Sequence, residues 1–191
     1  MTEVAGDYNA DRSMAALPDL ITVEQYRRLP DDGVHLYELH QGEIAEVTQP
    51  KAGHWKLQRR LERLLQPKLA SFGEVGMEFA YPAIPEFDLR AADVAAVSKA
   101  RFEAMDSEDH LRGAAELVIE VMSSSNTKSK LRELVSLCLA NGAIEYWFVD
   151  RKKKSVTVMR KDGSSAVYEP GSAIPLAAFG SDLLPVTAIF E

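Results

Sequence analysis

Residues 116–132 read ELVIEVMSSSNTKSKLR: a branched apolar run with one internal acid, then a polar turn, then a basic segment. The apolar run predicts a buried β-strand over residues 116–122, because branched side chains favour the pleated conformation. Ser125 or Asn126 is expected to cap a helix over residues 128–140. This strand–turn–helix unit predicts a sheet covered by helices.

Two further apolar runs extend the pattern on either side of this unit. Residues 92–97 read ADVAAV and residues 143–149 read AIEYWFV, and both are typical of buried strands. We therefore expect an α/β (α+β) fold with a mixed central sheet whose middle strands cover 94–97, 117–121 and 144–149. The other expected elements are a short capped helix from Thr22, an N-terminal hairpin over 34–48, a helix over 52–69, a strand over 73–81 and a closing hairpin over 155–160 and 165–169.

Length and composition limit the class of protein. The chain has 191 residues, 46% of them hydrophobic, which predicts a single domain over residues 19–191 after a flexible N-terminal tail over residues 1–18. Neither a secretory signal nor a membrane-spanning run is evident, so we expect a cytoplasmic protein. The net charge of −7 argues against a protein that coats nucleic acid, but not against an enzyme that contacts it briefly.

Two acids inside apolar strands are the strongest candidates for chemistry. Asp93 lies in ADVAAV and Glu120 in LVIEVM. A carboxylate among such neighbours is costly to bury unless it meets a cation or hydrogen-bond donors. If the two strands pair, the acids could share a hard cation such as Mg²⁺, which would polarise a phosphoryl oxygen. The alternative is that each acid points to the solvent side of its strand.

Other candidates have plainer alternatives. The turn after Glu120 could bind phosphate or could simply cap a helix. Cys138, between two leucines, is better explained as a buried apolar residue than as a nucleophile. His54 could face a cleft, although a surface position is the simpler interpretation. The basic clusters at 59–63 and 151–154 could contact a phosphate backbone or be ordinary solvated surface.

The segments ITVEQYRRLPDD, YELHQGEIAEV, LRAADVAAVSKARF, ELVIEVMSSSNTKSKLREL and ANGAIEYWFVD occur here in order. Together they resemble the Uma-type family of restriction endonucleases, a former domain of unknown function in the PD-(D/E)XK nuclease superfamily. The resemblance implies a restriction-endonuclease-like core that cuts phosphodiesters with Mg²⁺ or Mn²⁺. It implies that Asp93 and Glu120 bind the metal and that Glu38, in YEL, assists catalysis.

The sequence departs from the family pattern at three positions. Ala92 replaces the proline before the first acid, and Met122 stands where many superfamily members have lysine. The family usually carries its lysine on the following helix, where this chain has Leu134. Lys130, one helical turn earlier, is the first candidate to replace it, and Lys128 is the second.

Two functions follow from these observations. The first is a metal-dependent endonuclease that takes DNA as a transient substrate. The second is a catalytically degenerate nuclease fold that serves as a binding or regulatory module, as the loss of lysine at Leu134 suggests. An unrelated small-molecule enzyme on the same sheet stays open as a third. No membrane partner is expected, and the EYWFV strand and C-terminal segment suggest a possible homodimer.

Overall fold

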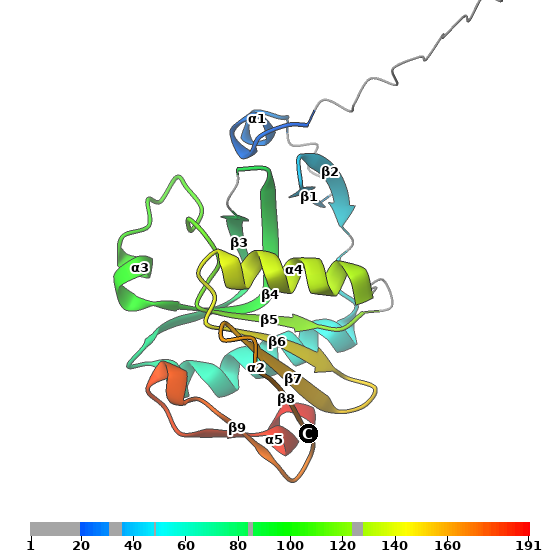
Figure 1. Cartoon of the computed structure of the whole chain (residues 1–191), viewed down its shortest axis with the longest axis vertical. Coiled ribbons are helices and arrows are strands. Elements are labelled where there is room, and N and C mark those ends of the chain that lie inside the picture. The colour runs from blue at the N-terminus through cyan, green and yellow to red at the C-terminus, as the bar shows by residue number, and fades with distance from the viewer. Residues whose placement is uncertain (1–19, 31–35, 48, 84–85, 124–127) are drawn as a thin grey trace, which may run out of the picture.

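A mixed sheet of eight strands forms the centre of the molecule (Figure 1). The computed structural model describes residues 20–30, 36–47, 49–83, 86–123 and 128–191. The strand order is β2-β1-β4-β5-β6-β7-β8, and β3 pairs with β4 beside this path. The strands are β1 Leu36–His40, β2 Glu43–Val47, β3 Gly73–Ala83, β4 Asp88–Ser98, β5 Leu117–Val121, β6 Glu145–Asp150, β7 Ser155–Arg160 and β8 Ser165–Tyr168.

The three strands predicted at the centre of the sheet, β4, β5 and β6, are neighbours in the middle of the observed strand order. Strands β5 and β6 are parallel, as expected of two strands joined by a crossover helix, and the other pairs in this sheet are antiparallel. The mixed α/β architecture predicted from the sequence is therefore confirmed. The predicted tail over residues 1–18 and the caps at Ser125 or Asn126 lie outside the described residues.

One face of the sheet is covered by helix α2 (Ala52–Leu69) and by the C-terminal segment. The leucines of α2 that recur every four residues are buried there, as a helix with one apolar stripe requires. The C-terminal segment consists of β9 Ala173–Pro175, a 3₁₀ turn at Ala177–Phe179, β10 Leu183–Pro185 and α5 Val186–Phe190. Its buried residues join the same core, which we call the first core.

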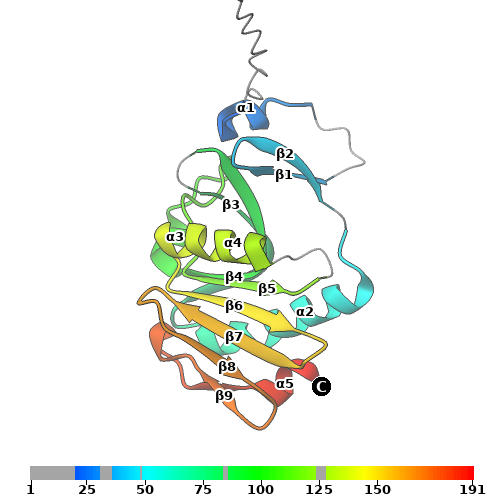
Figure 2. The same cartoon turned by 45° about the vertical axis from the view of Figure 1, so that its right-hand side comes forward.

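The opposite face carries helix α4 (Lys128–Ala140), which lies across the middle of the sheet in both views (Figures 1 and 2). Val135 and Cys138 of α4 pack with Tyr146 of β6 in what we call the second core. The sheet is thus buried on both faces, which explains why its central strands read as continuous apolar runs.

The N-terminal hairpin forms as predicted. Gln41 and Gly42, between β1 and β2, both have positive φ (52° and 85°), the pattern of a tight two-residue turn that matches strand twist. Helix α1 (Val23–Arg27) begins with the predicted capping box between Thr22 and Gln25. The hairpin pairs with β4 and so brings β1 beside the strand that carries Asp93.

Several elements differ from the sequence-based expectation. Strand β4 covers Asp88–Ser98, longer than the predicted 92–97, because β3 pairs with it from end to end except at Asp93. The short helix α3 (Lys99–Glu103) was not predicted. Strand β6 lies inside the sheet, and the buried residues of the C-terminal segment pack on the first core. Within the described residues, no helix has the length and apolarity needed to cross a membrane.

Candidate functional site

Strands β3 and β4 bend together at one point, where two acids face each other. Met77 pairs with Val94 and Phe79 pairs with Ala92, which leaves Glu78 opposite Asp93 without a ladder pair. Glu78 has a φ of 50°, uncommon for a residue with a side chain. Across this point β3 changes face, since Met77 packs on the first core and Phe79 on the second.

The Asp93 carboxylate connects this bend to two other elements. Its Oδ1 accepts hydrogen bonds from His54 Nε2 (2.9 Å) and Gln58 Nε2 (2.8 Å), both on α2. Its Oδ2 accepts one from the backbone N–H of Val121 at the end of β5 (2.6 Å). Because an ionised carboxylate only accepts, the imidazole is assigned with its proton on Nε2. Asp93 is therefore held in one orientation from both sides.

Glu78 shares one of these donors. Its Oε1 accepts a hydrogen bond from the same Gln58 Nε2 at 2.6 Å. Burial raises the pKa of Glu78 above its ordinary value, and the negative charges of Asp93 and Glu38 raise it further, whereas the Gln58 hydrogen bond and His54 lower it. Glu78 was not among the residues selected from the sequence.

Glu120 precedes Val121 and so lies next to the residue that binds Asp93 through its backbone. Loss of hydration raises the pKa of the Glu120 carboxyl well above its ordinary value. The charges of Asp93, Glu38 and Glu78 act in the same direction. Four neighbouring strands thus bring Glu38, Glu78 and Asp93 close enough for their charges to act on Glu120.

Glu38 completes this group from β1. Its Oε1 accepts a hydrogen bond from Ala91 N (3.2 Å) on the neighbouring β4, and its Oε2 lies 2.6 Å from His40 Nε2. Of the five side chains selected from the sequence, the structure thus gathers the acids Glu38, Asp93 and Glu120. We refer to these three and Glu78 as the acidic cluster.

The basic candidates lie on α4. Lys130 is exposed in the first turn of that helix, and the side chain of Lys128 is outside the described part of the chain. Leu134, at the position where the family resemblance places lysine, is partly buried against the second core. An apolar contact has therefore replaced the expected cation at this position.

Two residues of α2 that were not selected from the sequence belong to the site. A surface position was the simpler of the two interpretations of His54, yet its side chain is only 19% exposed because it packs against Asp93. Gln58 is completely buried. Both lie on the side of α2 that carries the buried leucines, and a polar residue on such a stripe is a signal that could have found them.

The donor atoms of this site suit a hard divalent cation. Carboxylates and an amide carbonyl are the ligands that Mg²⁺ and Mn²⁺ prefer, and Gln58 Oε1 is buried without a hydrogen-bond partner. Within the described ranges, however, no three His, Cys, Asp or Glu side chains are already arranged to hold a metal ion. Protein donors, including the Gln58 amide, occupy the oxygens of Asp93 instead.

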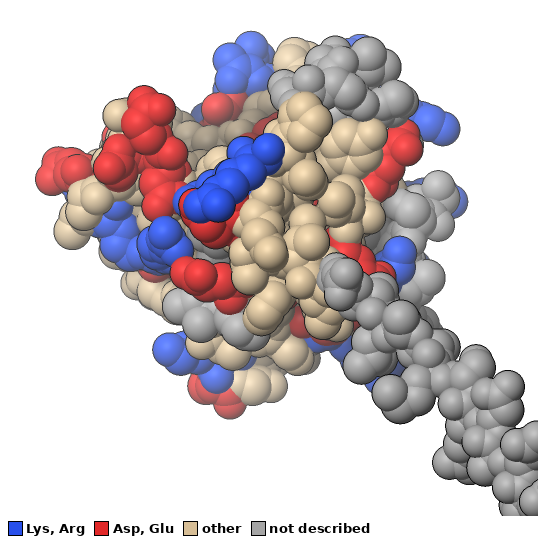
Figure 3. Space-filling view, turned by 90° about the horizontal axis from the view of Figure 1, so that it is seen from above, with Lys and Arg blue, Asp and Glu red and all other residues tan. Residues whose placement is uncertain are grey.

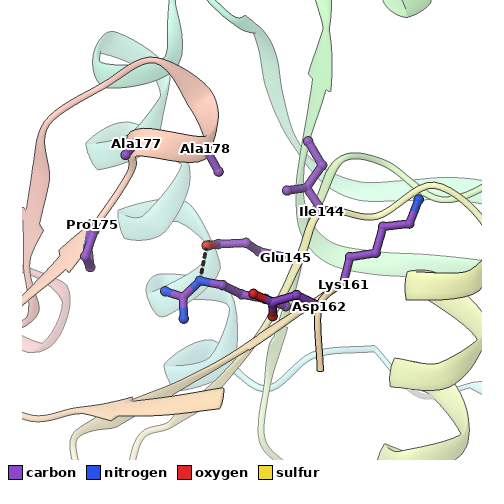
Figure 4. A pocket seen from close by; sticks show the side chains of 8 residues that line it. Ile144, Glu145, Lys161, Asp162, Pro175, Ala177 and Ala178 are labelled. Atoms are coloured by element: carbon purple, nitrogen blue, oxygen red, sulfur yellow. Dashed lines mark hydrogen bonds and ion pairs between the residues drawn. The ribbon is translucent and has the colours of Figure 1, made fainter. Parts of the chain in front are cut away.

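A separate pocket of about 330 Å³ lies at the other end of β6 (Figure 4). Its lining includes Glu145, whose carboxylate accepts hydrogen bonds from Arg160 Nε (2.9 Å) and Trp147 Nε1 (2.8 Å). Glu120 pairs with Phe148, further along the parallel β5–β6 ladder, so the pocket is distinct from the acidic cluster. Because the Glu145 carboxylate is fully engaged, we assign it a structural role.

The sequence profile of the Uma2 family, described as "Putative restriction endonuclease", matches residues 23–186. The chain belongs to the Uma2 family. Among solved structures, a putative nuclease of DUF820 from Anabaena variabilis is similar, with a TM-score of 0.75, 18% sequence identity, and coverage of 89% of this chain and 97% of that one. No curated protein matches the sequence. At this identity the structural likeness shows a shared fold.

The family resemblance drawn from the sequence is confirmed by the Uma2 match. The matched range includes β1, β3, β4 and β5, so all members of the acidic cluster lie within the Uma2 region. On the described face that Figure 3 shows, acidic and basic side chains are interspersed rather than gathered in one basic patch. This agrees with the net charge of −7, which argues against a nucleic-acid coat.

Proposed function

We propose that this Uma2-family chain is a Mg²⁺- or Mn²⁺-dependent endonuclease that hydrolyses DNA phosphodiester bonds. The observation that carries the proposal is the acidic cluster, in which Asp93 and Glu120 come together from adjacent strands. The charge of Asp93 contributes to the raised pKa of Glu78 and of Glu120, and a divalent cation would neutralise this concentration of negative charge. The family description and the likeness to a structure titled as a nuclease support the same reaction.

Each residue of the site would have a distinct role in this reaction. Asp93, Glu120 and Glu78 would hold the cation, which when bound would polarise the phosphodiester and activate a water molecule. His54 fixes the orientation of Asp93 through its Nε2–H. Glu38, held by Ala91 N, would orient metal or water from the hairpin. Lys130 or Lys128, from the start of α4, would stabilise the developing phosphate charge.

Plasmid nicking tests this proposal. Purified protein with supercoiled plasmid and Mn²⁺ should produce open circles, and EDTA should abolish them. Glu120→Gln should remove the activity, while Glu169→Gln, at an exposed acid outside the acidic cluster, should not. Nicking that persists in Glu120→Gln at the wild-type rate would overturn the assignment.

A second function is favoured by one specific observation. Leu134 packs against the second core where the family resemblance expects lysine, so the charge-stabilising group could be lost. We infer from this an alternative in which the protein is a degenerate nuclease fold that binds DNA or a protein without cutting. Calorimetry separates the two functions, since the module would retain its partner but fail to bind Mg²⁺ or Mn²⁺ at millimolar concentration.

Location and assembly stay predictions. We propose a cytoplasmic protein with DNA as its transient partner. The homodimer suggested by the EYWFV strand and the C-terminal segment also stays a prediction, and light scattering of the purified chain would decide the oligomeric state.

A further inference from the structure

Gln58 is the one fully buried residue of α2 that is not apolar. Its relative exposure is 0%, equal to that of Leu61 one turn further on. A buried amide needs partners for both its nitrogen and its oxygen, because its hydration is lost. Gln58 satisfies only half of this requirement.

The nitrogen half is fully used. Gln58 Nε2 has two hydrogens, and it donates to Glu78 Oε1 (2.6 Å) and to Asp93 Oδ1 (2.8 Å). The opposite orientation of the amide would place its oxygen against two carboxylate oxygens, which would repel it. In the absence of a cation, the NH₂ group therefore has to face the acids, where its partial positive charge links two negative groups.

The amide oxygen of Gln58 has no hydrogen-bond partner among the residues that the structure describes. Gln58 Oε1 is one of two buried side-chain N or O atoms without a hydrogen-bond partner in the described part of the chain. In native proteins roughly nine in ten buried polar groups have a hydrogen-bond partner. An unpaired buried oxygen therefore points to a ligand or a donor that is not yet in place. Here the unpaired atom is the oxygen of an amide whose nitrogen contacts two carboxylates.

We propose that Gln58 is a positioning residue that bridges Glu78 and Asp93 in the cation-free protein and turns its amide when a divalent cation binds between them. Rotation about the Cγ–Cδ bond exchanges Nε2 and Oε1, so the unpaired oxygen joins the carboxylate oxygens. This deepens the proposed function and rests on its assumption that the acidic cluster binds a cation.

The exchange makes cation binding and the Gln58 bridge compete. A side chain with no NH₂ loses the bridge, so the cation-free protein becomes less stable. A carboxylate at position 58 would instead present an oxygen to the cation in either orientation, so the protein would bind the cation more tightly. If Gln58 were purely structural, its substitution would change stability equally with and without the metal and would leave the affinity for the cation unchanged.

Two substitutions separate these effects, with a matched control on the same helix. Gln58→Leu removes both polar atoms at similar size, and Gln58→Glu replaces the NH₂ with oxygen. Gln66→Leu is the control, because Gln66 lies on the same helix two turns after Gln58. It also binds β3, accepting a hydrogen bond from Val75 N (2.9 Å) and donating one to Glu74.

Thermal melting in EDTA and in 5 mM Mn²⁺ gives the first readout. We expect Gln58→Leu to lower the melting temperature in EDTA by roughly 5 °C, where it removes the bridge between Glu78 and Asp93. The deficit relative to wild type should differ in Mn²⁺, because there the substitution removes an oxygen ligand of the cation instead of the bridge. The Gln66→Leu deficit should be equal in both solutions. Equal deficits for Gln58→Leu in EDTA and in Mn²⁺ would overturn the proposal.

Calorimetric titration with Mn²⁺ gives the second readout and is independent of DNA cleavage. We expect Gln58→Glu to bind Mn²⁺ roughly tenfold more tightly than wild type, since a carboxylate replaces an amide. Equal or weaker binding would overturn the proposal, as would the absence of binding in both proteins. If the metal-dependent effects occur without plasmid nicking, the role of Gln58 stands and the endonuclease function fails. If nicking occurs and the effects of the Gln58 substitutions do not depend on metal, the endonuclease function stands and the role of Gln58 fails.

Discussion

Removal of the Asp93 carboxylate should destabilise the fold even when no metal is present. Asp93→Ala leaves three donors without their acceptor, namely His54 Nε2, Gln58 Nε2 and Val121 N. Hydrogen bonds to a charged group contribute about 1.5–3 kcal/mol each, so the lower end gives a loss of about 4–5 kcal/mol.

Relief of charge repulsion offsets part of this loss. Glu78 and Glu120 would no longer face the Asp93 charge, which should return about 1–2 kcal/mol at the effective dielectric of a partly buried site. The net expectation is that Asp93→Ala lowers the free energy of unfolding by about 3 kcal/mol, from contributions that do not involve catalysis.

Equilibrium urea unfolding in EDTA at pH 7.5 measures this quantity directly. Glu169→Gln, an exposed acid outside the acidic cluster, should stay within about 0.5 kcal/mol of wild type. A loss below about 1 kcal/mol for Asp93→Ala would refute the claim that Asp93 anchors α2 and β5. Because of this cost, loss of nicking in Asp93→Ala would not by itself identify a metal ligand, and Glu120→Gln is the cleaner variant.

The remaining predictions concern the other distinctive residues. Leu134→Lys should raise Mn²⁺-dependent nicking about tenfold by restoring a cation beside the site, and an unchanged rate in the folded variant would argue against that role. The raised pKa of Glu120 means that the folded state binds more protons than the unfolded state above the ordinary value of 4.5, so stability in EDTA should fall as pH rises through this window. Glu120→Gln should flatten that slope in urea unfolding at pH 5, 7 and 9, and a slope equal to that of wild type would contradict the assignment. Burial raises the pKa of the Cys138 thiol to about 12, so it should react with a disulfide reagent only as fast as the protein unfolds. Rapid modification in native buffer would contradict this.

The sequence was sufficient for the main helices and strands because their patterns are local. Helix α2 has the predicted bounds, and the central strands read as apolar runs because both faces of the sheet are covered. The placement of Asp93 and Glu120 on adjacent strands follows from the same patterns. The prediction that Cys138 is buried is confirmed.

The rest of the site depends on long-range geometry. Glu78 becomes part of the acidic cluster only through the bend at which β3 and β4 change faces, and no local pattern marks that bend. The position of Gln58 on the leucine stripe of α2 marks it as buried, but its contacts with Glu78 and Asp93 appear only when the helix is docked on the sheet. The length of β4 was underestimated because pairing with β3 stabilises residues 88–91, whose own preference for strand is weak.

Anomalous diffraction from crystals soaked in Mn²⁺ would test the central claim most directly. We predict one anomalous peak bounded by the carboxylates of Glu78, Asp93 and Glu120, with the Gln58 amide turned so that Oε1 faces it. A peak elsewhere, or none at these carboxylates at millimolar Mn²⁺, would contradict the claim that the acidic cluster is a metal centre for phosphodiester hydrolysis.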